Sequence, residues 1–238
     1  MIDILKKILS FFNLEINRRP ISEAKKQQWI RDAGFKTILD IGANRGYFAK
    51  EMRELLPRAQ IHCFEPLPDC FHQLLQNTKD DSLVVCHPVG LGIQNESLTM
   101  FQNEYSPSSS LLEMTELHIR NFPQTRHTHQ KEVTIHRLDD FLEGKELQVP
   151  LFIKIDVQGF EDKVILGGEK TIQQADALLI EMSFVPLYHQ QPLFHDIYRL
   201  VTQLGFEFRG TFHQLFDEEK GTVLQMDGIF INKRISTR

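Results

Sequence analysis

The sequence predicts an α/β fold in which a mostly parallel sheet is covered by helices on both faces. Three observations support this prediction. Short apolar runs of strand length alternate with amphipathic helical patterns along most of the 238 residues. Several of these runs end in an acidic residue, and a glycine turn follows the first of them. The last two strand patterns are joined by a short polar segment, which indicates an antiparallel edge hairpin.

The first part of the chain alternates regularly between strands and helices. Its expected elements are a strand over 37–41, a turn over 42–46, a helix ending before Pro57, a strand over 60–64, a helix over 69–77 and a strand over 83–86. Parallel strands need such helical crossovers, so this alternation is the main support for a parallel sheet.

The alternation then breaks. Strand patterns over 96–101 and 132–136 indicate an antiparallel pair, and the polar stretch between them contains His118, His127 and His129. A connection this long within a compact domain is usually functional or mobile. We therefore expect either a lid on the substrate side or a flexible tether.

The regular pattern resumes in the last third of the chain. Its expected elements are a strand over 151–155, a helix opened by Gly159 and closed by Gly167 and Gly168, a strand over 177–180, a helix over 194–204 and strands over 206–209 and 228–231. The last two strands form the predicted edge hairpin.

Residues 1–34 are predicted to form a helical extension, followed by a main domain over 35–238 with an inserted hairpin or lid around 93–137. Apolar residues over 2–12 share one helical face. This face indicates packing on the domain or on a second copy in a homodimer, with a membrane surface as the alternative. Charged residues interrupt the apolar run, so we predict neither stable membrane insertion nor a signal peptide.

The net charge and the cysteine content of the chain indicate which partners and which cellular compartment to expect. The formal net charge is −5, and without a basic excess we expect no nucleic-acid partner. The three cysteines, Cys63, Cys70 and Cys86, are odd in number and form no C-x-x-C pair. We therefore expect reduced thiols in a cytoplasmic protein.

A glycine turn followed by an acid at the next strand end predicts a nucleoside site. Gly42 and Gly46 are spaced G-x-x-x-G, which is not the dinucleotide fingerprint. Glu65 follows the second strand, where a carboxylate accepts ribose hydroxyls. Asp40 would repel a pyrophosphate and suits a cation such as the amino group of S-adenosylmethionine. The alternative is an ordinary strand–helix turn with a solvated Glu65.

Two further strands end in acids, Asp156 and Glu181. Ligands of open α/β sheets bind at the carboxyl ends of the strands. The clustering of acidic residues at these strand ends predicts that this edge of the sheet is a functional site.

Short motifs spread over residues 37–232 follow one another in a specific order. They are the turn at 40–46, Phe64-Glu65-Pro66, Ser109-Ser110-Leu111, Leu138-Asp139-Asp140, the segment 153–161, Ile180-Glu181-Met182 and Asp227-Gly228-Ile229-Phe230-Ile231. In this order they resemble the FkbM family of S-adenosylmethionine-dependent methyltransferases. Many relatives carry Glu where this chain has Gln158, so any role of that acid is in doubt here.

The resemblance implies a class I, Rossmann-like methyltransferase fold with seven strands. It also implies methyl transfer from S-adenosylmethionine to a hydroxyl of a sugar, glycolipid or specialised metabolite. The acceptor would thus be a carbohydrate or glycosylated metabolite, although a nitrogen acceptor stays open. By resemblance and position, the expected cofactor residues are Asp40, Gly42, Ala43, Asn44, Gly46, Tyr47, Glu65, Pro66, Val89 and Leu91.

Four residues are candidates for contact with the acceptor. Asp156 is the first, as base, hydrogen-bond anchor or metal ligand, and Glu181 is the second. Lys154 shares the side of the strand that carries Asp156, and His189 lies in a loop after a strand. No metal-ligand set with recognisable spacing is present, so we predict no metal site. A nicotinamide-dependent oxidoreductase and a catalytically inactive S-adenosylmethionine-binding regulator remain as alternative functions.

Overall fold

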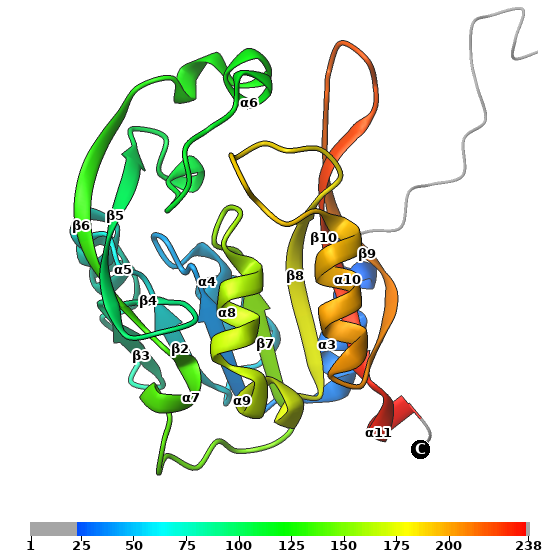
Figure 1. Cartoon of the computed structure of the whole chain (residues 1–238). Helices are drawn as coiled ribbons and strands as arrows, with labels where there is room; N and C mark the ends of the chain where they lie inside the picture. Colours follow the sequence, from blue (N-terminus) through cyan, green and yellow to red (C-terminus); the bar gives the residue numbers. More distant parts are fainter. Residues whose placement is uncertain (1–22, 237–238) are drawn as a thin grey trace, which may run out of the picture.

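The central sheet has seven strands in the order β3-β2-β1-β7-β8-β10-β9 (Figure 1). The computed structural model describes residues 23–236. The pairs β1–β2, β2–β3, β1–β7 and β7–β8 are parallel, whereas β10 runs antiparallel to both β8 and β9. The predicted mostly parallel α/β sheet and its antiparallel edge hairpin are confirmed.

The elements are bounded as follows. The strands of the central sheet are β1 (Thr37–Ile41), β2 (Gln60–Phe64), β3 (Val84–His87), β7 (Leu151–Ile155), β8 (Ala177–Ser183), β9 (Phe206–Phe216) and β10 (Val223–Asn232). A second sheet contains β4 (Gly90–Leu91), β5 (Glu96–Asn103) and β6 (Thr128–His136). The helices are α2 (Glu23–Lys26), α3 (Gln28–Ala33), α4 (Tyr47–Leu55), α5 (Pro68–Thr78), α6 (Glu116–Asn121), α7 (Leu138–Phe141), α8 (Glu161–Gly167), α9 (Glu169–Gln174), α10 (Phe194–Gln203) and α11 (Lys233–Ser236), with 3-10 turns η1 (Ser106–Ser108) and η2 (Pro123–Thr125).

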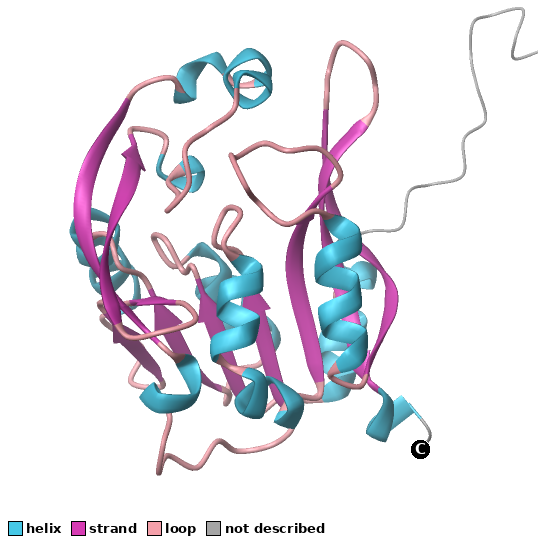
Figure 2. Cartoon of the chain, in the orientation of Figure 1, coloured by secondary structure: helices cyan, strands magenta, loops and turns pink. Residues whose placement is uncertain are grey.

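Helices cover both faces of the central sheet (Figure 2). On one face, side chains of α7, α8, α9 and α10 pack against the strands in one apolar cluster. On the other face, α3, α4 and α5 form a second cluster with the opposite side chains of the same strands. All five residues of β1 are buried because this strand is covered from both sides.

Two features of the central domain differ from the expectation. Helix α9 has no strong apolar pattern, and it begins where Asp139 accepts the N–H groups of Lys170 and Thr171. Strands β9 and β10 extend well beyond the predicted 206–209 and 228–231. Their outer parts rise past the helices as a hairpin, so they need no continuous apolar run to form.

The inserted hairpin is built from β5 and β6, which pair antiparallel as predicted. The short strand β4 adds to β6 in parallel and completes a three-stranded sheet that the sequence pattern did not reveal. Its inner side chains Val133 and Ile135 pack on Leu67 and Cys70 around the start of α5. This contact fixes the second sheet against the central domain.

The polar stretch between β5 and β6 is folded and hydrogen-bonded. It contains η1, α6 and η2, and it contacts the loop between β8 and α10. The N–H of Thr115 donates to the carbonyl of Leu187 at 2.9 Å, and the N–H of His189 donates to the carbonyl of Glu113 at 2.8 Å. These contacts favour a substrate-side wall over a flexible tether.

The predicted N-terminal extension is described only in part. Helices α2 and α3 belong to it, and the apolar face over residues 2–12 lies outside the described residues. Within residues 23–236, every helix is too short or too polar to cross a bilayer.

Candidate active site

The carboxyl ends of β1, β2, β7 and β8 open into a cavity of about 720 Å³. The insertion contributes Tyr105 and Ser106 to its wall, and the hairpin of β9 and β10 contributes Phe212, His213 and Asp227. Segments far apart in the sequence therefore meet over one edge of the sheet (Figure 1). This is the edge where the sequence places its acids.

The turn after β1 requires glycine for a steric reason. Gly42 has φ +81°, and a Cβ there would lie 1.9 Å from the carbonyl oxygen of Asp156. The turns after β1 and β7 thus touch backbone to backbone. Asn44 in the same turn also adopts a left-handed conformation, with φ +47°, and lines the cavity.

Glu65 connects this turn to the end of β2. One carboxylate oxygen accepts the N–H of Asn44 at 2.9 Å, and the other accepts the N–H of Leu67 at 2.8 Å. Burial raises the pKa of Glu65 to about 7, although both backbone donors oppose the shift. Glu65 lines the cavity and is only 5% exposed, so the alternative of a solvated side chain is wrong.

Asp40 lies behind the cavity rather than in its wall. Its side chain is fully buried on the α4 face of the sheet, and neither carboxylate oxygen is hydrogen-bonded. Its nearest opposite charge is the ammonium of Lys154, at 3.6 Å. Burial raises the pKa of Asp40, and Lys154 opposes this shift. Asp40 does not line the cavity, because its side chain is fully buried, and its contact with the cofactor stays a prediction.

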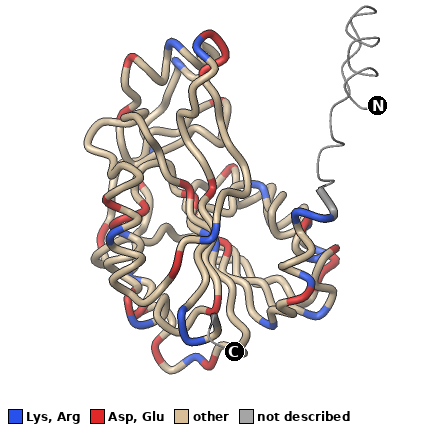
Figure 3. Tube along the Cα trace, turned by 90° about the vertical axis from the view of Figure 1, so that its right-hand side faces the viewer, with Lys and Arg blue, Asp and Glu red and all other residues tan. Residues whose placement is uncertain are grey.

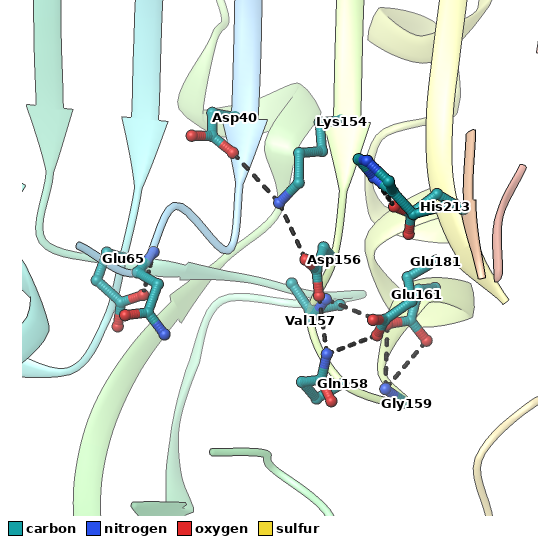
Figure 4. A network of polar contacts seen from close by, with 12 residues as sticks. Asp40, Glu65, Lys154, Asp156, Val157, Gln158, Gly159, Glu161, Glu181 and His213 are labelled. Carbon is teal, nitrogen blue, oxygen red and sulfur yellow. Dashed lines mark hydrogen bonds and ion pairs between the residues drawn. The ribbon is translucent and has the colours of Figure 1, made fainter. Parts of the chain in front are cut away.

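Lys154 stands between two carboxylates (Figure 4). Its ammonium lies 3.1 Å from Asp156 and 3.6 Å from Asp40, and 5.3 Å from the centre of the Phe48 ring. Burial lowers the pKa of Lys154, but attraction to Asp156 and Asp40 outweighs it and raises the pKa overall. Lys154 therefore stays cationic and holds the carboxylate of Asp156 in place.

The turn after β7 is held by Glu161 at the start of α8. Its buried carboxylate accepts the N–H groups of Val157, at 3.1 Å, and Gly159, at 3.0 Å (Figure 4). Burial raises the pKa of Glu161 to about 7 against these donors. The turn therefore presents Asp156 and Gln158 to the cavity in a defined orientation.

Gln158 joins the two acidic strand ends through its side-chain amide. The Nε2 group donates to Asp156 Oδ1 at 2.9 Å and to Glu181 Oε2 at 2.6 Å, while Oε1 accepts the hydroxyl of the buried Tyr188 at 2.9 Å. Burial and the charge of Asp156 raise the pKa of Glu181 well above its ordinary value. For Asp156, burial is outweighed by Lys154 and Gln158, and its pKa is lowered. An amide suits this place because it can donate to both carboxylates.

Replacing Gln158 with glutamate should destabilise the protein in a pH-dependent way. Gln158→Glu places a third carboxylate beside Asp156 and Glu181, and loses both donated hydrogen bonds. We expect the free energy of unfolding to fall by about 1–3 kcal/mol at neutral pH. The introduced carboxyl has a raised pKa in the folded state, so its deficit should grow as the pH rises and shrink as the pH falls.

Urea unfolding of Gln158→Glu and of the wild type at a series of pH values below and above neutral checks the expectation. Gln190→Glu is the matched control, because Gln190 also has a positive φ, of +62°, but is exposed. We expect the control to change stability by less than about 0.5 kcal/mol. Equal losses in the two variants would contradict the bridging role of the amide.

The structure separates the residues proposed from the sequence into two groups. Those that line the cavity are Gly42, Ala43, Asn44, Tyr47, Glu65, Pro66, Leu91, Lys154, Asp156 and Glu181. Asp40, Gly46, Val89 and His189 do not line it. Gly46 begins α4, Val89 packs against the core, and His189 is exposed on the loop after β8. His189 does not line the cavity, because its side chain is exposed on this loop while the neighbouring Tyr188 is buried, and its contact with the acceptor stays a prediction.

Several cavity residues were not found from the sequence. Ser106 donates to Asn44 Oδ1 at 2.9 Å and ties the insertion to the turn after β1. His213 Nδ1 lies 3.3 Å from Asp227 Oδ2, across the hairpin of β9 and β10. For His213 and Asp227, the available signal in the sequence was the predicted hairpin of the last two strands. The pattern underestimated the lengths of these strands, so both residues were left outside or at the edge of the site. Among residues 23–236, no three His, Cys, Asp or Glu side chains form a group that could hold a metal ion.

Comparison with protein families gives a match over most of the described chain. A model of the methyltransferase FkbM domain matches residues 40–208. The chain is similar to the 2-O-methyltransferase NoeI of Sinorhizobium fredii (strain NBRC 101917 / NGR234), at 27% identity over 186 residues, which are 75% of this chain and 73% of that protein.

Two solved methyltransferase structures are similar to this one. The TehB-like SAM-dependent methyltransferase of Corynebacterium glutamicum has a TM-score of 0.44 and 11% identity, with 98% of this chain and 96% of that chain covered. Aeropyrum pernix fibrillarin, in complex with natively bound S-adenosyl-L-methionine, has a TM-score of 0.47 and 12% identity, with 82% and 66% covered.

Proposed function

Because the chain belongs to the FkbM methyltransferase family and is an S-adenosylmethionine-dependent methyltransferase, we propose that it methylates a hydroxyl group of a sugar, glycolipid or related specialised metabolite. The observation that carries this proposal is the similarity to a 2-O-methyltransferase over three quarters of the chain. The family membership decides against a nicotinamide-dependent oxidoreductase.

The cavity residues fit S-adenosylmethionine, which supplies an electrophilic methyl group on a sulfonium when bound. Glu65 is a buried carboxylate on the cavity wall and can accept both ribose hydroxyls. Gly42 lets the turn after β1 pack against the backbone of Asp156, so that Gly42, Ala43 and Asn44 line the cavity close to Glu65. Leu91 and Pro66 offer apolar contacts beside Glu65, which suit the adenine ring.

The other half of the cavity suits a polyhydroxylated acceptor. Tyr47 and Tyr105 line the cavity and are 67% and 53% exposed, so their rings can cover the C–H face of a sugar. Asp156 and Glu181 lie beyond them at the strand ends and can accept hydrogen bonds from hydroxyls. Apolar surface with a few fixed polar groups is the usual composition of a small-molecule site.

Asp156 is the residue that we propose to orient the acceptor hydroxyl. Lys154 and Gln158 hold its carboxylate from two sides, so a bound hydroxyl would meet an acceptor of fixed direction. Holding reactants in a productive geometry can lower the activation barrier by several kcal/mol, with an upper limit of about 7–11 kcal/mol. The low pKa of Asp156 makes it a hydrogen-bond anchor rather than a strong base.

The proposed partners and location follow the same observations. Lys and Arg are interspersed with Asp and Glu along the described trace, in keeping with a small-molecule partner rather than a nucleic acid (Figure 3). Cys63, Cys70 and Cys86 are free thiols, which suits a reducing compartment such as the cytoplasm.

Radiolabelled methyl transfer tests the proposed function. The full chain is incubated with labelled S-adenosylmethionine and a panel of methyl glycosides, with catechol and a primary amine as non-sugar acceptors. We expect label in at least one glycoside as an ether that is stable to base. Transfer only to catechol or the amine would contradict the sugar acceptor, and binding without turnover on any acceptor would favour the inactive regulator.

Glu65 should make donor binding depend on pH. Its carboxylate must be ionised to accept two ribose hydroxyls, and its pKa is about 7. We expect the affinity for S-adenosylhomocysteine to be about tenfold weaker near pH 6 than near pH 8, since one proton must then be lost on binding. Calorimetric titration measures this change.

The variant Glu65→Gln tests whether Glu65 causes the pH dependence of the affinity for S-adenosylhomocysteine. We expect its affinity to be about 10–100-fold lower, because the charge-assisted hydrogen bonds are lost, and to vary less with pH. The amino group of the ligand also titrates, so the difference between wild type and variant is the informative quantity. Identical pH dependence in the two proteins would rule out Glu65 as the source.

A further inference from the structure

We propose that the His213–Asp227 pair is the general base of the reaction, with His213 taking the proton of the acceptor hydroxyl and Asp227 orienting its imidazole. This inference rests on the proposed function, because only a protonated acceptor atom such as a hydroxyl oxygen needs a base. Both residues line the cavity, and neither was proposed from the sequence.

The position of the pair in the fold is the first support. His213 lies on β9 and Asp227 on the neighbouring strand β10. Asp227 is the register partner of Glu181 on β8, so the pair continues the row of polar groups that starts at Asp156. Figure 4 shows His213 beside Glu181 and Lys154, on the same edge of the sheet. The pair therefore borders the half of the cavity that we assign to the acceptor.

The geometry of the pair is the second support. His213 Nδ1 lies 3.3 Å from Asp227 Oδ2, and a carboxylate at this distance favours the tautomer with the proton on Nδ1. The opposite nitrogen, Nε2, then carries the basic lone pair. The His213 side chain is 57% exposed, so a ligand in the cavity can reach it. A histidine oriented by a carboxylate is the usual construction of a base that works near neutral pH.

The three ionisable groups at the ends of β7 and β8 are each engaged by another side chain of the cavity. Lys154 is held as a cation by two carboxylates. Asp156 already faces that ammonium and the amide of Gln158. Glu181 Oε2 is taken by the same amide at 2.6 Å. The charged groups that line the cavity on the neighbouring strands are Asp227 on β10, Glu181 on β8, and Asp156 with Lys154 at the end of β7.

The proposed step balances without a further reagent. The hydroxyl oxygen of the acceptor forms a bond to the methyl carbon while the carbon–sulfur bond breaks and its electron pair stays on sulfur. The hydroxyl proton passes to His213 Nε2, and the imidazolium is stabilised by Asp227. The products are the methyl ether and S-adenosylhomocysteine, and the proton then leaves to solvent.

The first test needs no acceptor. Nitrogen-15 NMR of histidine-labelled full-length protein, with and without S-adenosylhomocysteine, reports the tautomer of each neutral imidazole. We expect the proton of His213 on Nδ1 in the wild type and a shift toward the Nε2–H form in Asp227→Asn. A neutral His213 with its proton on Nε2 in the wild type would overturn the inference, whatever the acceptor.

The second test measures methyl transfer to the glycoside found in the acceptor panel. We expect His213→Gln to lower kcat by about 10²–10⁴-fold, as for loss of a general base. The affinity for S-adenosylhomocysteine should stay within about threefold of wild type, because this affinity reports the donor half of the cavity. In the wild type, we expect kcat/KM to fall as the pH is lowered, because a protonated His213 cannot act as a base. This fall should be absent in His213→Gln.

His195→Gln is the matched control. His195 lies 3.2 Å from Asp196, but this pair is on α10, does not line the cavity, and its histidine side chain is 72% exposed. We expect His195→Gln to keep kcat and the pH profile of the wild type. A kcat of His213→Gln within about threefold of wild type would overturn the inference. Absence of label in every glycoside with the wild type would instead refute the proposed function, and the NMR result would still decide whether the pair is built as described.

Discussion

Lys154→Met should lower the free energy of unfolding by about 3–5 kcal/mol, because it removes one partner from a buried ionic cluster. Lys154 is 13% exposed and is the nearest cation to Asp40, which is fully buried and lacks any hydrogen bond to its carboxylate. The substitution would leave that charge and part of the charge of Asp156 uncompensated. Urea unfolding, followed through the fluorescence of Trp29, measures the loss.

The pH dependence of this loss has a defined sign. The pKa of Asp40 is already raised in the folded wild type, and removing Lys154 raises it further. A group with a raised folded pKa contributes stability below its unfolded pKa of about 3.9 and loses it as the pH rises. The deficit of Lys154→Met should therefore be largest at neutral pH and shrink toward about pH 4.

Two variants make the test specific to the buried cluster. Lys163→Met removes an ion pair with Asp162 in which the lysine side chain is 42% exposed, and it should cost less than about 1 kcal/mol. The double variant Asp40→Asn/Lys154→Met should regain at least part of the lost stability, because the buried charge is absent. A double variant less stable than Lys154→Met would contradict this account.

Gly42→Ala should lower the affinity for S-adenosylhomocysteine by at least about a hundredfold, which corresponds to about 2.7 kcal/mol. A Cβ at this position would meet the carbonyl oxygen and carbon of Asp156 at 1.9 and 2.9 Å. Both contacts are with backbone atoms, so the turns after β1 and β7 must move apart. This movement would displace the part of the cavity wall that we assign to the cofactor. Calorimetric titration measures the affinity, and urea unfolding measures the accompanying loss of stability.

Gly144→Ala separates this clash from simple backbone strain. Gly144 has φ +73°, close to that of Gly42, but a Cβ there would meet no heavy atom within 4 Å. We expect a loss of stability of about 1 kcal/mol and unchanged ligand affinity, because only the left-handed conformation is disfavoured. Ligand affinity in Gly42→Ala within about threefold of wild type would show that the turns can separate without harm to the site.

Much of the donor side could be predicted because its residues are close in sequence and their spacing carries the information. The turn at residues 42–46 and Glu65 lie on consecutive strands, so their meeting follows from the βαβ connection alone. The structure places Glu65 on the cavity wall, with a hydrogen bond to Asn44. Asp40, Gly46 and Val89 do not line the cavity, and the pattern could not show that the fold packs these residues outside its wall.

The side of the cavity that we assign to the acceptor could not be predicted in the same way. His213 and Asp227 lie where the pairing of β9 and β10 is irregular, which no pattern along one strand reveals. The lengths of these strands were underestimated because their outer parts are solvated. Tyr188 was missed in favour of its neighbour His189, since the direction of a loop side chain depends on what packs beneath it.

The sequence by itself determined the succession of the main strands and helices of the central sheet, the glycine turn, the acids at the strand ends and the membership of a family. Each of these depends on spacing along one segment, which the periodicity of strands and helices translates directly into position. Only the tertiary structure decided that Lys154 pairs with the two carboxylates of Asp40 and Asp156, that Gln158 bridges Asp156 and Glu181, and that a histidine–aspartate pair lines the cavity. Burial, register across an antiparallel pair and contact between distant turns depend on the whole fold, and no local pattern encodes them.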